Sequence, residues 1–77
     1  MAIGYVLINT AVATEREVYS ELLKVKEIVE LSSLFGEFDL IAKVESSDFN
    51  ALGRVVVGMI RSIKGVTDTK TLVAIEF

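Results

Sequence analysis

The sequence has 77 residues, contains no Cys and no His, and carries a formal net charge of -3. These properties exclude disulfides, argue against a structural zinc site and, without any run of Lys and Arg, disfavour direct nucleic-acid binding. A single domain this small is only marginally stable alone, so we expect it to gain stability by associating with other copies.

The first part of the chain predicts a strand followed by a helix. Residues 3–8 are rich in β-branched and aromatic side chains and predict a buried strand. Thr14 and Glu17 have the spacing of a capping box, which predicts a helix over residues 15–26. The apolar face of this helix consists of Val18, Leu22 and Val25.

The middle of the chain predicts a hairpin. Residues 28–35 and residues 38–45 each have the composition of a strand, and a short turn at Gly36 and Glu37 joins them.

A second helix and a last strand complete the predicted elements. Ser46 or Ser47 is expected to cap the helix, which ends at Gly65 as the glycine that follows the last helical residue. Apolar residues recur through it at helical spacing, namely Phe49, Leu52, Val56, Met59, Ile60 and Ile63. The last strand is predicted over residues 69–77.

The predicted order βαββαβ is the ferredoxin-like α+β arrangement, in which two helices cover one face of a four-stranded antiparallel sheet. Apolar side chains occupy both faces of the strands, as Tyr5 and Leu7 alternate with Val6 and Ile8 in the first one. Because the helices cover only one face, the other would expose a large apolar patch. We therefore expect a homodimer formed by sheet-to-sheet contact.

The sequence offers little for catalysis. Without His or Cys it lacks the usual general base and nucleophile, and it contains no phosphate-binding loop or nucleophile elbow, so we expect no enzyme activity, cofactor or metal site. Glu15, Glu17 and Glu21 fall in the first turns of a helix, where the helix dipole favours acids, and are interpreted as a solvated face. The chain has no Pro, no linker and no signal or membrane-spanning segment, so we expect one cytoplasmic domain over residues 1–77.

The stretch LFGEFDLIAKV places Asp39 where a strand begins, although strands seldom contain Asp. Gly36 supplies a turn and an exposed N–H group. A half-buried carboxylate needs a donor or a cation as partner, whereas an Asp at a wet strand end is ordinary. The candidate partners within the chain are Lys43, Arg54 and Arg61.

The stretch GVTDTKTLVAI places Thr69 and Thr71 on one face at the start of the last strand, with Lys70 between them pointing to solvent. Thr is also a favoured strand residue, so the spacing alone does not separate a binding role from a structural one.

Together these two stretches resemble the stand-alone RAM domain, which is the ligand-binding domain of the Lrp/AsnC (feast/famine) regulators without their helix-turn-helix. LFGEFDLIAKVE is similar to the Gly-x-(Tyr/Phe)-Asp-Leu hairpin of that family, and IKGVTDTKTLVAI is similar to its Gly-Val-x-x-Thr-x-Thr segment. The resemblance covers residues 3–75, and both motifs fall in the matching elements of the βαββαβ order.

This resemblance implies a sensor of an amino acid or related small effector that forms dimers, assembles into rings of eight or ten subunits, and binds effectors between dimers. Gly36 and Asp39 would hold the charged main-chain end of the effector, with Asp39 accepting from the ammonium group. Thr69 and Thr71 of a neighbouring dimer would add hydroxyl groups. The remaining residues expected at the site are Leu34, Phe35 and Phe38.

The first strand begins almost at Met1, so by the same resemblance we expect no DNA binding by the chain itself and a full-length Lrp/AsnC relative as a candidate partner. Other proteins with this fold remain as alternatives: a small dimeric enzyme of the antibiotic-monooxygenase or muconolactone-isomerase type, or an ACT-like regulatory domain. An RNA-recognition fold is disfavoured because only Tyr5 and Phe38 offer aromatic rings and the net charge is acidic. Acylphosphatases and soft-metal chaperones are disfavoured by the missing phosphate loop and Cys pair.

Overall fold

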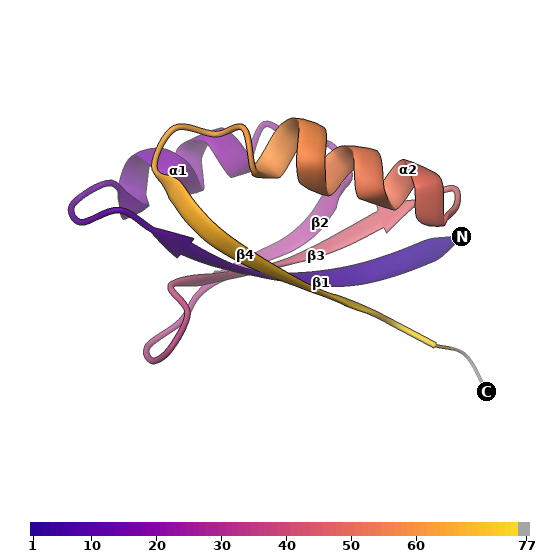
Figure 1. Cartoon of the computed structure of the whole chain (residues 1–77), viewed down its shortest axis with the longest axis horizontal. Helices are drawn as coiled ribbons and strands as arrows, with labels where there is room; N and C mark the ends of the chain where they lie inside the picture. The colour runs from indigo at the N-terminus through magenta and orange to yellow at the C-terminus, as the bar shows by residue number, and fades with distance from the viewer. Residues whose placement is uncertain (76–77) are drawn as a thin grey trace.

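Four strands form one antiparallel sheet in the order β2-β3-β1-β4, and the helices lie together on one face of it (Figure 1). The computed structural model describes residues 1–75. The elements are β1 (Ala2–Thr10), α1 (Glu15–Leu22), β2 (Ile28–Ser33), β3 (Leu40–Ser46), α2 (Phe49–Arg54), η1 (Val55–Ile60) and β4 (Val66–Val73). The predicted ferredoxin-like α+β fold is confirmed.

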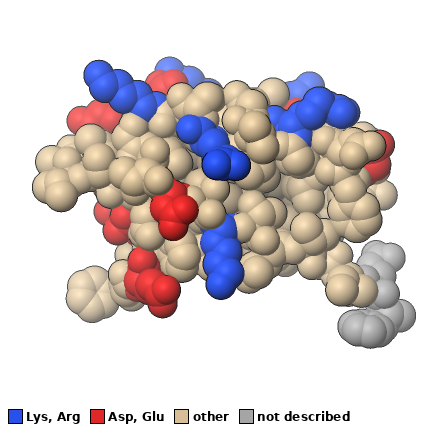
Figure 2. Space-filling view, viewed as in Figure 1, with Lys and Arg blue, Asp and Glu red and all other residues tan. Residues whose placement is uncertain are grey.

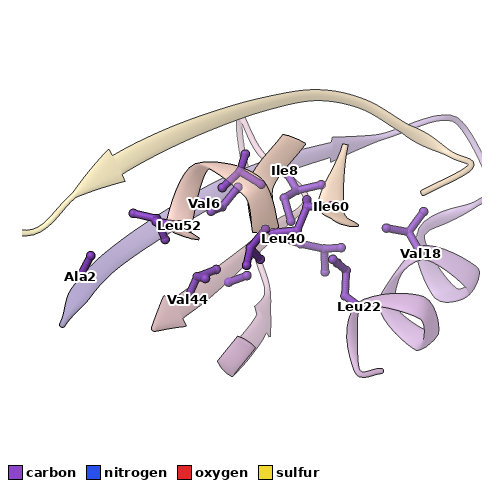
Figure 3. Close-up of a cluster of buried hydrophobic side chains, with 12 residues drawn as sticks. Ala2, Val6, Ile8, Val18, Leu22, Leu40, Val44, Leu52 and Ile60 are labelled. Atoms are coloured by element: carbon purple, nitrogen blue, oxygen red, sulfur yellow. The ribbon is translucent and has the colours of Figure 1, made fainter. Parts of the chain in front are cut away.

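The hydrophobic core lies between the helices and the sheet. Even-numbered residues of β1 and β3 point toward the helices, because side chains alternate along a strand. Figure 3 shows side chains from both helices and both central strands pointing into one cluster. Its fully buried large side chains are Val6, Ile8, Val18, Leu22, Leu40, Val44 and Ile60. Among residues 1–75 no polar or charged residue is buried with them.

The second helix departs from the predicted pattern. Phe49 and Met59, predicted to be buried, are 67% and 45% exposed, whereas Val55 is buried. The segment η1, which continues α2, is a π-helix, and Arg61 N–H donates to Val56 O, five residues earlier, at 2.9 Å. Each turn of a π-helix holds more residues than an α-helical turn, so the inward-facing positions shift. Leu52, Val56 and Ile60 are buried as predicted.

The predicted start of the first helix is confirmed, whereas its capping box and the predicted cap of the second helix are wrong. Thr14 is the N-cap residue of α1, but its hydroxyl donates to Ala11 O at 2.8 Å and caps no helix N–H group, and α1 ends at Leu22 instead of residue 26. At the start of α2, the Asp48 carboxylate accepts from Ala51 N–H at 2.7 Å, and neither Ser46 nor Ser47 is the cap. Asp is among the best capping residues, so it prevails over the adjacent serines.

Substitution of Asp48 by Ala is expected to lower the free energy of unfolding by about 1 kcal/mol, because the Ala51 N–H group loses its partner. Urea denaturation at fixed protein concentration measures this loss. Ser47→Ala is the matched control and should leave the midpoint unchanged. Equal losses in the two variants would contradict the assignment of the cap to Asp48.

The strand ends also differ from the prediction. β2 ends at Ser33 and β3 begins at Leu40, so a loop of residues 34–39, closed by Leu34 N–H donating to Asp39 O at 2.8 Å, replaces the predicted two-residue turn. β4 begins at Val66, before the predicted residue 69, and is paired as far as Val73. The end of the predicted strand, residues 76–77, lies outside the described residues.

Gly65 is not the glycine that ends the second helix, because that helix already stops at Ile60. It lies in the turn before β4 with a φ of +105°, a backbone conformation that favours glycine. Its carbonyl accepts from Ala11 N–H at 2.7 Å, which ties the turn to the segment after β1.

The face of the sheet away from the helices carries apolar and charged side chains. Tyr5 lies opposite Lys43 on one side and Leu72 on the other, and Leu7 lies opposite Ile41. Tyr5 and Leu72 are 37% and 49% exposed. The expected apolar residues on the uncovered face are therefore present, with lysines beside them.

In the view of Figure 2, Lys and Arg side chains are scattered among Asp and Glu side chains, and they form no continuous basic stripe on the side of the molecule shown. Within residues 1–75, no helix has the length and hydropathy needed to cross a bilayer.

Candidate functional site

Asp39 is the last residue of the loop before β3 and is half-buried. Its Oδ2 atom accepts two hydrogen bonds from Thr10, one from the backbone N–H at 2.8 Å and one from the hydroxyl at 3.1 Å. The Asp39 N–H group donates to Ile8 O at 3.0 Å. The carboxylate is thus held in place by the end of β1.

None of the three predicted cationic partners pairs with Asp39. The only ion pair within residues 1–75 joins Lys24 and Glu21, at 2.8 Å. Both hydrogen bonds to the Asp39 side chain end on Oδ2, so Oδ1 has no partner in the described part of the chain. This leaves one carboxylate oxygen available to a group from outside.

Thr10 was not predicted as a site residue. The pairing of β1 with β3 ends at Ile8 and Leu40, so the Thr10 N–H group, which points to the β3 side as the Ile8 carbonyl does, has no strand partner there. The Asp39 carboxylate accepts a hydrogen bond from this N–H group. The sequence gives no sign of this contact, because the two residues are 29 positions apart.

The loop of residues 34–39 brings the other predicted residues of the hairpin together. Figure 1 shows it projecting to the side of the sheet away from the helices. Phe35 is fully exposed, Leu34 is 38% exposed and Phe38 is half-buried. Gly36 has a φ of +149°, and no atom lies within 4 Å of the position that a Cβ would take. An exposed aromatic ring beside an open glycine marks a surface that can contact a ligand or another subunit.

Thr69 and Thr71 share one face of β4, as predicted, and it is the face that carries the helices, since Thr69 lies opposite Ile8 and Thr71 opposite Val6. Thr69 is half-buried and Thr71 is exposed. Lys70 is exposed, as predicted, on the uncovered face of the sheet.

Asp39 and Thr69 lie at the same end of the sheet but on strands separated by β1. Ile8 pairs with Leu40 on one side and with Thr69 on the other. Two strand spacings correspond to about 10 Å. Asp39 and Thr69 of a single chain are therefore separated by the width of β1.

A small hollow of about 150 Å³ lies beside Thr69. Its walls are formed by Arg61, Val66, Thr67, Asp68 and Thr69, and Thr71 is not among them. The sequence predicts Arg61 only as a partner for Asp39 and gives Asp68 no role. The hollow contains a cation, a carboxylate and two hydroxyl groups, which together suit a polar ligand.

A larger hollow of about 700 Å³ lies on the outer side of the molecule, between α1 and the end of the second helix. It is lined by exposed acids and lysines, including Glu17, Glu21 and Lys64, and by Glu27, whose Oε1 atom is buried without a hydrogen bond. None of the predicted site residues reaches it. Within residues 1–75 no group of three or more acidic side chains could hold a metal ion.

The model of the Lrp/AsnC ligand binding domain family matches residues 4–77 of the chain. Over 63 residues the chain is 35% identical to an uncharacterized HTH-type transcriptional regulator of Pyrococcus abyssi, and the match covers 82% of this chain and 42% of the relative. The chain therefore spans about two fifths of the length of such curated relatives.

Two solved structures illustrate the fold. The crystal structure of FFRP-DM1 has a TM-score of 0.93 and 36% identity, and the match covers 97% of this chain and 100% of that one. The transcriptional regulator NMB0573 of Neisseria meningitidis, solved as a complex with L-Met, has a TM-score of 0.88 at 22% identity, and the match covers 97% of this chain and 50% of that one. At that identity the second likeness shows the shared fold alone.

Proposed function

The chain belongs to the Lrp/AsnC ligand-binding domain family, and from this premise we propose that residues 1–77 act as one non-enzymatic domain that binds an amino acid or related small effector. Its relatives are named as transcriptional regulators, which supports a regulatory role. On the same fold another regulator binds L-Met. The apolar core of the described residues supports binding at a surface or between subunits, and not in an internal cleft.

This proposal rests mainly on the hydrogen bonding of the Asp39 carboxylate. Thr10 holds Oδ2 with two hydrogen bonds, and Oδ1 is left without a partner. A carboxylate that is already oriented and half-buried accepts strongly from an ammonium group, because such charge-assisted bonds are about twice as strong as neutral ones. Asp39 would therefore bind the ammonium group of the effector.

The other groups at the proposed site complete a zwitterion-binding surface. The backbone N–H of Gly36 in the exposed loop would meet the charged main-chain end of the ligand. Leu34, Phe35 and Phe38 would surround its side chain. Since Asp39 and the threonines of one chain are separated by β1, Thr69 and Thr71 would come from a neighbouring dimer.

The same geometry supports assembly. The uncovered sheet face would pair with that of a second copy to form a dimer, and dimers would join into a ring of eight or ten subunits with effectors between them. We further propose that the chain modulates a full-length Lrp/AsnC relative by co-assembly and does not bind DNA itself, because its net charge of -3 disfavours contact with phosphate groups.

A thermal-shift screen of the standard L-amino acids at millimolar concentration tests the effector. At least one is expected to raise the melting temperature of the intact assembly, since a ligand present at 100 times its dissociation constant adds about 2.7 kcal/mol of stability. Asp39→Asn retains the shape of the side chain and an oxygen for Thr10 but removes the charge, so it should abolish the shift.

Asp48→Asn is the matched control, because Asn still caps α2 while the same charge is removed elsewhere. This variant should respond to the amino acid as the wild type does. The proposal fails if no amino acid stabilises the wild-type assembly, or if Asp39→Asn responds as strongly as the control.

A further inference from the structure

The small hollow beside Thr69 points to a role for Arg61. We propose that Arg61 binds the carboxylate of the effector, and that Asp68, on the same wall, makes the hollow select a zwitterion over a simple anion. This inference rests on the proposed function and adds the group that recognises the second charge of the ligand.

The position of Arg61 is fixed by the end of the second helix. It follows Ile60, the last residue of η1, and its N–H group donates to Val56 O at 2.9 Å. The turn that follows is held by Val66 N–H donating to Ile63 O at 3.1 Å, and it brings the start of β4 against the helix end. Arg61 and Thr69 therefore line one hollow although they come from different elements.

The charges in this hollow are complementary to those of an amino acid. Arg61 and Asp68 face the same space but form no ion pair within residues 1–75. A guanidinium group binds a carboxylate through two parallel hydrogen bonds. A carboxylate ligand alone would be repelled by Asp68, whereas a ligand that also carries an ammonium group satisfies both residues. The hydroxyls of Thr67 and Thr69 supply further donors and acceptors.

The volume of the hollow, about 150 Å³, suits the main-chain end of an amino acid and not a large ligand. The ligand's ammonium group and side chain would both face the mouth of the hollow and the neighbouring subunit. There the loop of residues 34–39 and the free Oδ1 atom of Asp39 would complete the site, so two copies of the chain would share one effector.

The presence of Arg61 also has a structural explanation, and the test must distinguish that explanation from the proposed binding role. A cation near the C-terminus of a helix is stabilised by the helix dipole. Lys serves that purpose as well as Arg does, but it cannot form the paired hydrogen bonds of a guanidinium. Arg61→Lys should therefore retain the thermal stability of the ligand-free protein while it binds the effector more weakly than wild type.

The experiment uses titration calorimetry on the intact assembly, with the standard L-amino acid that gives the largest thermal shift, its carboxamide and its des-amino acid. The wild type should bind each analogue about tenfold or more weakly than the amino acid, since each lacks one charged hydrogen-bonding group. Arg61→Gln should weaken the amino acid about tenfold and leave the carboxamide unchanged. Asp39→Asn should weaken the amino acid and leave the des-amino acid unchanged.

Arg54→Gln is the matched control, because Arg54 is also exposed on the second helix but does not line the hollow. It should bind all three ligands as the wild type does. The role of Arg61 is overturned if Arg61→Gln binds the amino acid as tightly as this control, or if the wild type does not distinguish the amino acid from its carboxamide. In both cases the proposed function still stands, whereas it falls if no amino acid binds the wild type.

Discussion

Replacing Gly65 by Ala is expected to lower the free energy of unfolding by about 3 kcal/mol, the sum of backbone strain and overpacking. Gly65 has a φ of +105°, which an alanine adopts only with strain. A Cβ at this position would lie 2.8 Å from Cγ2 of Val18 and 2.9 Å from Oγ1 of Thr14. Val18 is fully buried in the core, so it cannot move away easily.

Urea denaturation at fixed protein concentration measures this effect, and Gly53→Ala is its control. Gly53 lies in α2 and has no atom within 4 Å of its would-be Cβ, so alanine there should stabilise the protein by about 0.5 to 1 kcal/mol. If Gly65→Ala proved as stable as the control, the close packing of the turn against α1 would be wrong. The placement of Thr67, Asp68 and Thr69 at the start of β4 would then be in doubt as well.

Replacing Leu72 by Glu is expected to convert the assembly into monomers at micromolar concentration, with a dimer dissociation constant raised about 100-fold or more. Leu72 lies opposite Tyr5 on the sheet face that we propose as the dimer interface. It is 49% exposed in the single chain, so a Glu there is tolerated by the monomer. In the dimer, however, the carboxylate would be buried without a partner. Light scattering measures the change in mass.

Val57→Glu provides the comparison for this variant. Val57 is 61% exposed on the second helix, in the other layer of the molecule, and takes no part in the proposed sheet contact. Its substitution should leave the mass of the assembly unchanged. A dimer that survives Leu72→Glu, or one that is lost equally in both variants, would move the interface away from the sheet.

The fold was predictable because it depends on local patterns. Strand alternation placed Val6 and Ile8 on the face opposite Tyr5 and Leu7, and the structure confirms this arrangement. The order of strands and helices followed from the same patterns, because no linker or Pro-rich segment divides the sequence. Alternation and helical spacing are properties of neighbouring residues, so a single sequence reveals them.

Features that depend on competition between similar residues were not predictable. Asp48 caps α2 although two serines directly before it are also good caps. Met59 is exposed because η1 takes a π-helical turn, and the helical spacing assumed a regular α-helix. In each case the pattern identified the element but not its local geometry.

The candidate site was predicted in part. The loop that carries Gly36 and Asp39 was located from the sequence, as was the shared face of Thr69 and Thr71. The hydrogen bonds from Thr10 were missed because they depend on where the pairing of β1 with β3 ends. The hollow lined by Arg61 and Asp68 was missed because it depends on how a turn brings a helix end against a strand. Such contacts arise only in the folded chain.

The central claim, that an effector is held by Asp39 where copies of the chain meet, is tested most directly by native mass spectrometry with a mixture of the standard amino acids. The account predicts an even-numbered assembly of the 8.4 kDa chain that gains the mass of one kind of amino acid, and an Asp39→Asn assembly of the same size that gains none. A folded species at 8.4 kDa without bound amino acid would contradict it.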